Sequence, residues 1–129
     1  MSERDIIVGK SGTATAIVNE SNTAKAAGSG SLDVFATPMM VALMEKAACT
    51  ALADSLADGE SSVGTAISVA HTAASPLGAK IIATATITDI DGRKVSFTVI
   101  AADEMGEIGR GTHTRVIVDT RRFMQKLQK

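Results

Sequence analysis

The segment that most restricts the fold is residues 38–57, where the sequence predicts the one long helix of the chain. Pro38 suits the first turn of a helix, and Thr37 before it suits the N-cap position. The run Met39–Met44 is apolar on every face of such a helix, so this half must be covered nearly all round. The helix is expected to end near Gly59. The rest of the chain must therefore wrap around a single helix.

Most of the remaining sequence predicts β-strands, because runs rich in Val, Ile and Thr alternate between apolar and polar positions. Strands are expected over residues 9–19, 62–71, 80–90, 93–102 and 107–118, and a short basic helix over 120–129. Residues 19–33 are small and polar, which is typical of a loop within a domain. The pair Asp91-Gly92 predicts a two-residue hairpin turn.

One apolar helix beside five strands has few packing solutions. We expect an α+β fold in which a five-stranded antiparallel sheet curls around the helix, with residues 1–129 forming one domain. A sheet of this kind has open edges, and pairing with a second copy would cover one of them. The sequence therefore predicts a homodimer or a dimer of dimers.

The composition excludes several other functions. A net charge of −1 gives no attraction to nucleic acid or an anionic membrane, and three Phe residues are too few for a base-stacking platform. The longest nearly apolar stretch, residues 35–44, is about half of the ~20 residues that a membrane span needs. A single cysteine and an N-terminus without a signal-peptide core favour a cytoplasmic protein. Two histidines and one cysteine show no metal-ligand spacing, so no metal is expected.

Three polar residues do not fit an apolar core. Glu45 ends the apolar half of the helix, where an unpaired buried carboxylate would cost several kcal/mol, and it could serve as a base or nucleophile with a raised pKa. His71 is in phase with Ile67 and Val69, which carries it to the helix-facing side of its strand. The Thr37 hydroxyl could attack a thioester or hold a water if a base lay beside it. Each also has a structural explanation: an ion pair, a satisfied core position and a helix cap.

Two segments containing these residues resemble a known family. They are residues 35–45, FATPMMVALME, and residues 63–72, VGTAISVAHT. Both are similar to hotdog-fold acyl-CoA thioesterases related to fluoroacetyl-CoA thioesterase. That family spaces a Thr, a Glu and a His by eight and then twenty-six positions, and here the differences are 45 − 37 = 8 and 71 − 45 = 26. The likeness extends over nearly the whole chain and includes residues 109–113 and Arg115.

The resemblance implies a hotdog fold and hydrolysis of an acyl-CoA thioester to free acid and CoA. It implies that Thr37, Glu45 and His71 form the catalytic set, and that the site lies at a dimer interface. No cofactor is expected, because coenzyme A is part of the substrate.

The resemblance also implies the residues that bind the substrate. Gly64 would offer a backbone N–H near the thioester carbonyl, Phe35 would lie at the acyl group, and Arg115 would contact a CoA phosphate. The remaining phosphate candidates, each equally explained as part of a solvated charged face, are Lys80, Arg110, Arg121 and Arg122. The fluoroacetyl-specific enzyme closes its acyl pocket with aromatic residues. Because this chain has few aromatics, a general acyl-CoA substrate is the expectation.

Helix geometry complicates this picture. Eight residues at about 1.5 Å each place Thr37 and Glu45 ~12 Å apart, beyond hydrogen-bond reach. Either the chain bends back before Pro38, or the groups line a longer cleft, or a second subunit completes the set, and we favour the last. Whether Thr37, Glu45 or a water is the nucleophile stays open.

Two other functions remain possible from the sequence. A hotdog dehydratase or hydratase would also use a histidine and a carboxylate, but it would leave the thioester intact. A non-catalytic acyl-CoA-binding module would bind ligand independently of Glu45 and His71.

Overall fold

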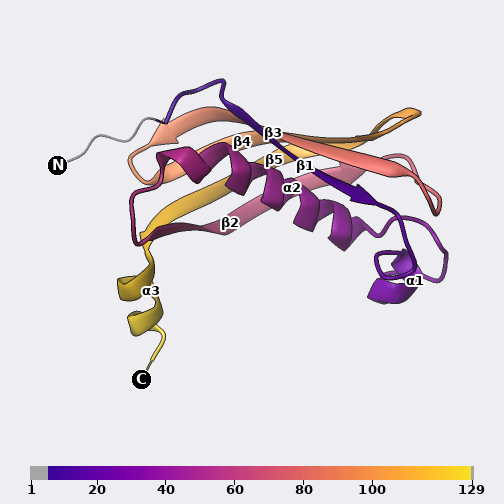
Figure 1. The fold of residues 1–129 in the computed structure, drawn as a ribbon, viewed down its shortest axis with the longest axis horizontal. Coiled ribbons are helices and arrows are strands. Elements are labelled where there is room, and N and C mark those ends of the chain that lie inside the picture. The colour runs from indigo at the N-terminus through magenta and orange to yellow at the C-terminus, as the bar shows by residue number, and fades with distance from the viewer. Residues whose placement is uncertain (1–5, 129) are drawn as a thin grey trace.

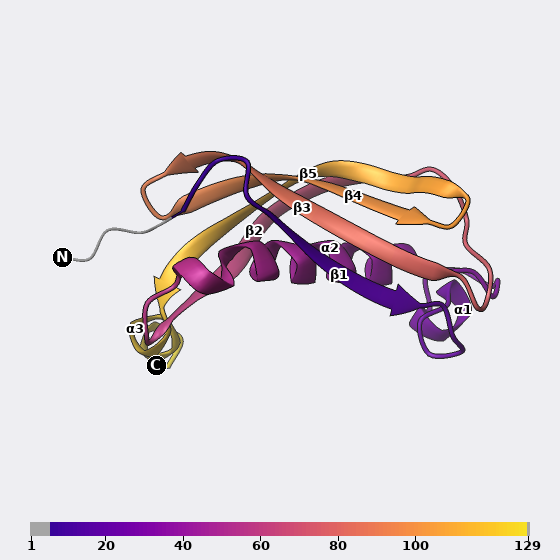
Figure 2. The same ribbon diagram turned by 45° about the horizontal axis from the view of Figure 1, so that its top comes forward.

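A computed structural model of the chain describes residues 6–128. The elements are β1 (Ser11–Ile17), α1 (Ala24–Ala27), α2 (Thr37–Leu52), the 3₁₀ turn η1 (Ala53–Ser55), β2 (Glu60–His71), β3 (Lys80–Asp91), β4 (Lys94–Asp103), β5 (Gly106–Asp119) and α3 (Thr120–Lys126). Figures 1 and 2 show the strands as one curled sheet with α2 lying along its inner face, and α1 and α3 at opposite ends of the molecule. Among these residues, no helix combines the length and the apolar character that crossing a membrane requires.

The sheet has the strand order β1-β3-β4-β5-β2, and all neighbouring strands are antiparallel. The chain leaves the sheet at one edge, β1, crosses its inner face as α2, and re-enters at the other edge as β2. The long helix therefore connects the two edge strands. This confirms the predicted fold class, a five-stranded antiparallel sheet around one helix with a short C-terminal helix.

The core lies between α2 and the inward-facing side chains of the sheet. The buried residues of the helix follow its period of 3.6, and those of β3 and β4 alternate with a period of two. The largest fully buried side chains include Phe35, Met40, Met44, Leu52, Ile81, Ile87, Phe97 and Ile117. At Gly12 of β1, an added Cβ would collide with the backbone of Ala51 in α2. The helix therefore lies directly against this strand, and only glycine fits there.

Helix α2 begins and ends differently from the prediction. Its first residue is Thr37 and the N-cap is Ala36, which has an extended backbone and makes no side-chain capping bond. The prediction that Thr37 caps the helix is therefore wrong, because the helix starts one residue earlier. Regular helix ends at Leu52 and gives way to η1, short of the predicted end at residue 57.

The segment predicted as a loop, residues 19–33, contains a short helix that the sequence did not predict. The hydroxyl of Thr23 accepts a hydrogen bond from the Ala26 N–H and caps α1, and Gly28 ends it in the left-handed conformation. The side-chain amide of Asn22 donates to the Ile17 carbonyl and ties this segment to the end of β1. The segment thereby stands beside the first turn of α2 (Figure 1).

One face of α2 is not covered within a single chain. Met39, Ala42 and Cys49 are exposed along it, although the sequence predicted coverage nearly all round. Met39 and Ala42 line a hollow together with Ala16 of β1, so these two exposed residues lie on the β1 side of the helix. On the other side, the edge strand β2 contains no fully buried residue.

Candidate active site

Thr37 and His71 form the closest contact between predicted site residues. Thr37 is the first residue of α2, and His71 is the last residue of β2. Thr37 Oγ1 and His71 Nδ1 lie 2.7 Å apart, although 34 positions separate the two residues in sequence. The contact arises because the start of α2 and the end of β2 meet at the same end of the molecule (Figure 1).

The environment of His71 keeps its imidazole neutral. Burial lowers the pKa of His71 below its ordinary value of 6.5, and the backbone of Ala73 acts in the opposite direction. On the far side of the ring, Nε2 is buried without a hydrogen-bond partner among residues 6–128. Ile67, Val69 and His71 are half-buried and alternate with exposed residues, which confirms that the histidine faces the helix side. A neutral imidazole beside a hydroxyl can accept that hydroxyl's proton.

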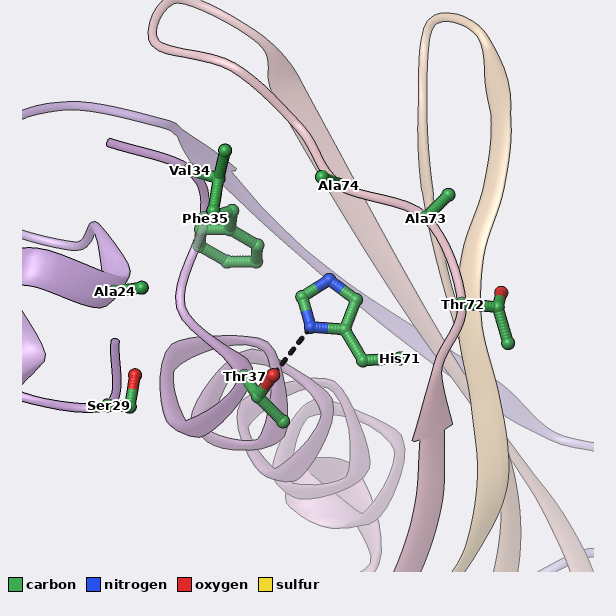
Figure 3. A pocket seen from close by; sticks show the side chains of 9 residues that line it. All are labelled: Ala24, Ser29, Val34, Phe35, Thr37, His71, Thr72, Ala73 and Ala74. Atoms are coloured by element: carbon green, nitrogen blue, oxygen red, sulfur yellow. Dashed lines mark hydrogen bonds between the residues drawn. The ribbon is translucent and has the colours of Figure 1, made fainter. Parts of the chain in front are cut away.

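A pocket of about 250 Å³ opens around this pair. In Figure 3 the His71 ring stands between the segment that carries Val34 and Phe35 and the segment that carries Ala73 and Ala74. The complete lining is Ala24, Ser29, Val34, Phe35, Thr37, His71, Thr72, Ala73 and Ala74. None of these residues is an Asp, Glu, Lys or Arg. Phe35 is buried and lines the pocket, where the resemblance places it.

Glu45 lies away from this pocket. It occupies the middle of α2, which is continuous from Thr37 to Leu52, so the ~12 Å separation of Glu45 and Thr37 applies. Its carboxylate accepts a hydrogen bond from Arg115 at 3.3 Å, and its side chain is 41% exposed. The ion pair, which was the structural explanation for Glu45, is therefore present, and the carboxylate is only partly buried. Within one chain, Glu45 therefore lies apart from the Thr37–His71 pair.

Arg115 is held entirely by protein groups. Its Nε donates to the Ser62 hydroxyl at 2.8 Å, and its Nη2 donates to the Ser62 carbonyl at 3.1 Å. The third nitrogen, Nη1, faces both Glu45 and His113. Its side chain is only 8% exposed, which weighs against contact with a CoA phosphate. That role stays a prediction that the geometry does not favour.

Gly64 lies against the same group of charged and polar side chains. A Cβ added there would come within 2.7 Å of Glu45 Oε2 and 3.3 Å of Arg115 Nη1. The register of β2 against β5 shifts between Gly64 and Ala66, which marks a β-bulge. A side chain at this position would therefore have to displace the Glu45 carboxylate. Its predicted contact with the thioester carbonyl is not tested by this arrangement.

The sequence did not assign His113 or Ser62 to the site. His113 is 2% exposed and lies beside Arg115. The alternation of β5 contains the signal, because His113 and Arg115 share the inward face with Ile117. By contrast, Arg110 is exposed and pairs with Glu107 at 2.6 Å.

Comparison with known proteins places the chain in a family. Residues 18–121 match the model of the fluoroacetyl-CoA-specific thioesterase family. The fluoroacetyl-CoA thioesterase of Streptantibioticus cattleyicolor is 45% identical over 97 residues, which cover 75% of this chain and 70% of that protein.

Solved structures agree in fold. A structure of fluoroacetyl-CoA thioesterase superposes with a TM-score of 0.88 at 38% identity and covers 95% of each chain. A variant of that enzyme in complex with fluoroacetate and CoA gives a TM-score of 0.85 at 39% identity, covering 91% of this chain and 98% of that one. A thioesterase superfamily member from Thermus thermophilus gives 0.90 at 26% identity, covering 98% and 93%. This chain belongs to the fluoroacetyl-CoA-specific thioesterase family, within the hotdog thioesterase superfamily.

Proposed function

We propose that this protein hydrolyses short, uncharged acyl-CoA thioesters to a free acid and CoA, with Thr37 and His71 of one chain and Glu45 of a second chain. Membership of the family makes it an acyl-CoA thioesterase. The observation that carries the assignment of residues is the 2.7 Å contact between Thr37 and His71 at the wall of a pocket. A related structure was solved with acetyl-CoA, which supports a substrate with a short acyl group.

The proposed chemistry begins with the Thr37 hydroxyl. Its proton passes to His71 Nδ1 as Oγ1 attacks the thioester carbonyl. The C–S bond then breaks, and the CoA sulfur takes the proton from His71, which leaves an acyl ester on Thr37. A water that loses its proton to Glu45 or His71 hydrolyses this ester, releases the acid and restores the Thr37 hydroxyl. The backbone N–H of Gly64 is the proposed donor to the developing oxyanion.

Glu45 reaches the pair only from a second copy in this proposal. The strand β2 is an edge of the sheet, and its unpaired backbone groups form a template for another strand. Beside it, α2 turns the partly exposed Glu45 toward Gly64 of β2. An antiparallel pairing of two β2 strands would join the two sheets and bring both α2 helices to the same side of the joined sheet. The proposal is therefore a homodimer with two-fold symmetry.

A specific pairing register completes the site. Residue 65 is the extra residue of the bulge, so Gly64 and His71 are six ladder positions apart in β2, about 20 Å along the strand. If the two-fold axis passes at Ser68, Gly64 of one chain stands opposite His71 of the other, because three ladder positions separate each of them from Ser68. Glu45 lies against Gly64 and would face the partner's pocket in this register. Two identical sites would result.

The pocket walls indicate the acyl group. A volume of about 250 Å³ is below the ~300–1,000 Å³ typical of pockets for drug-sized ligands, so it suits a short or branched acyl group rather than a fatty chain. With no Lys or Arg in the lining, a dicarboxylic acyl group would bring an unpaired charge into the pocket. Apart from the His71 imidazole, Phe35 is the only aromatic residue of the lining, so this chain supplies no aromatic gate there.

We expect release of free CoA thiol from acetyl-, propionyl- and isobutyryl-CoA, with kcat/KM at least about tenfold higher than for succinyl-CoA, because an unpaired carboxylate is costly to desolvate. Palmitoyl-CoA should be hydrolysed poorly for lack of space. Fluoroacetyl-CoA should be accepted alongside propionyl-CoA. The assay also separates the dehydratase alternative, since hydration releases no thiol.

Two results would contradict this proposal. Hydrolysis of fluoroacetyl-CoA alone would overturn the broad acyl specificity. Binding of the whole panel without any thiol release, by folded protein, would favour a binding module.

A further inference from the structure

A buried histidine beside the site has no part in the proposed chemistry. His113 in β5 is 2% exposed and stacks on Phe97, with ring centroids 5.9 Å apart. An apolar residue could fill this space without burying a polar ring. The hydrogen bonds of His113 therefore require an explanation beyond packing.

The two partners of His113 fix its protonation. The Ala66 carbonyl can only accept, so Nδ1, at 2.8 Å from it, carries the proton. The Arg115 guanidinium can only donate, so Nε2, at 3.2 Å from Nη1, carries the lone pair. A second proton on the ring would break the bond to Arg115 and set two cations against each other. Burial and the charge of Arg115 both lower the pKa of His113, although Glu45 acts in the opposite direction.

Through Nε2, His113 acts on the orientation of Arg115. The other two nitrogens of the guanidinium are held by Ser62, which leaves Nη1 to bridge His113 and Glu45. Because the guanidinium is planar and rigid, the lone pair on His113 Nε2 fixes the position of Nη1 relative to the Glu45 carboxylate. Loss of that acceptor would leave a buried donor unsatisfied and free Arg115 to turn.

Through Nδ1, the same ring acts on β2. Ala66 is the residue at which the register of β2 shifts, and the bond from His113 holds its carbonyl. His113 Cε1 also lies 3.2 Å from the position of a Cβ on Gly64, so the ring supports that residue directly. One side chain therefore contacts both Gly64 and the cation that binds Glu45.

We propose that His113 is a positioning residue for the thioesterase site, which through its neutral Nδ1–H tautomer orients Arg115 toward Glu45 and holds the β2 bulge next to Gly64. This inference rests on the proposed function, in which Glu45 and Gly64 serve the reaction.

The test begins with His113→Phe, which keeps a ring that can stack on Phe97 but removes both hydrogen bonds. We expect kcat to fall on the order of 10- to 100-fold with KM changed by less than about threefold, since misplacement of a catalytic group by ~1 Å costs up to ~10²-fold. Gln places an acceptor where Nε2 lies, whereas Asn places a donor where Nδ1 lies. His113→Gln should therefore recover more kcat than His113→Asn if the Arg115 contact dominates. Ile117→Val, a buried change on the same face of β5, is the control for mere loss of packing.

A double-mutant cycle separates this role from a structural one. Because His113 acts through Glu45, the His113→Phe change should cost much less in a Glu45→Gln background than in the wild type. Fully additive losses, or wild-type kcat in folded His113→Phe, would overturn the positioning role. If Glu45→Gln alone retains full activity, the proposed function fails at Glu45 instead, and the two failures are thus distinguishable.

A spectroscopic measurement checks the tautomer without relying on activity. The chain has two histidines, so the His71→Ala protein keeps only the His113 imidazole. Its nitrogen-15 NMR spectrum should show a neutral ring protonated at Nδ1 at pH 7. A ring protonated at Nε2, or a doubly protonated ring at that pH, would overturn the inference.

Discussion

Thr37→Ala and His71→Ala are each expected to lower kcat/KM for acetyl-CoA by about 10²- to 10⁴-fold, the range for loss of a positioned general base or its partner. The two side chains are 2.7 Å apart and no other titratable group of the same chain lines their pocket, so no neighbour within the chain can replace either one. Thr37→Ser keeps the hydroxyl and should retain most of the activity. Thr50→Ala is the matched control, because Thr50 is an exposed threonine of the same helix whose hydroxyl bonds only to the Lys46 carbonyl.

The pH dependence of the same reaction reports on His71. The base must be neutral to take the Thr37 proton, and burial lowers the pKa of His71 below 6.5. A lowered pKa keeps the neutral form present at lower pH, so the acid limb of kcat/KM should have its midpoint below 6.5. An acid limb above that value, or full activity in folded His71→Ala, would contradict the role of His71 as the base.

Glu45→Gln is expected to lower kcat by about 10²-fold or more while thermal stability stays close to that of the wild type. The amide has the same shape and can still accept a hydrogen bond from Arg115, but it cannot take a proton from water. Glu107→Gln is the matched control, since Glu107 is an exposed carboxylate that also pairs with an arginine, Arg110. Equal effects of the two changes would reduce Glu45 to a surface ion pair and remove it from the site.

Much of the fold could be predicted from the sequence because its patterns are local. The apolar run at the start of α2 and the alternation of the strands gave the element order, since a side chain's face follows from the period of its own element. Boundaries were less predictable. Helix α2 starts at Thr37 because Ala36 is the N-cap: its backbone is extended and its carbonyl accepts the first helical hydrogen bonds. The position of this cap depends on the backbone path before the helix, which a local pattern does not show. The four-residue helix α1 was missed because residues 19–33 have no apolar periodicity.

The site was only partly predictable, because it depends on contacts between distant segments. Thr37, Glu45 and His71 were selected as polar residues in apolar surroundings and by their family spacing. Spacing alone could not show that Thr37 pairs with His71 while Glu45 pairs with Arg115. The helix geometry did indicate that Thr37 and Glu45 cannot touch within one chain, and the structure agrees on that separation.

The roles of His113 and Arg115 could not be predicted from the sequence. A lone histidine on a strand has several ordinary roles, and only the tertiary structure shows its bonds to Ala66 and Arg115. The family resemblance assigned Arg115 to a CoA phosphate, yet its burial gives it protein partners instead. Residue type alone could not distinguish these two uses of the guanidinium.

The most direct test of a shared site is the activity of mixed dimers. A Thr37→Ala chain and a Glu45→Gln chain would be co-expressed with different affinity tags, and the heterodimer isolated by purification on both. If Thr37 and Glu45 act across the interface, one of its two sites is intact, and it should show about half of the wild-type activity per dimer although both parent homodimers are inactive.

The reciprocal heterodimer pairs a wild-type chain with a chain that carries both substitutions. A shared site predicts no activity for it, because each site then lacks either Thr37 or Glu45. The opposite pattern, an inactive heterodimer of single variants and a half-active reciprocal heterodimer, would contradict the shared site and place both residues in one chain's site.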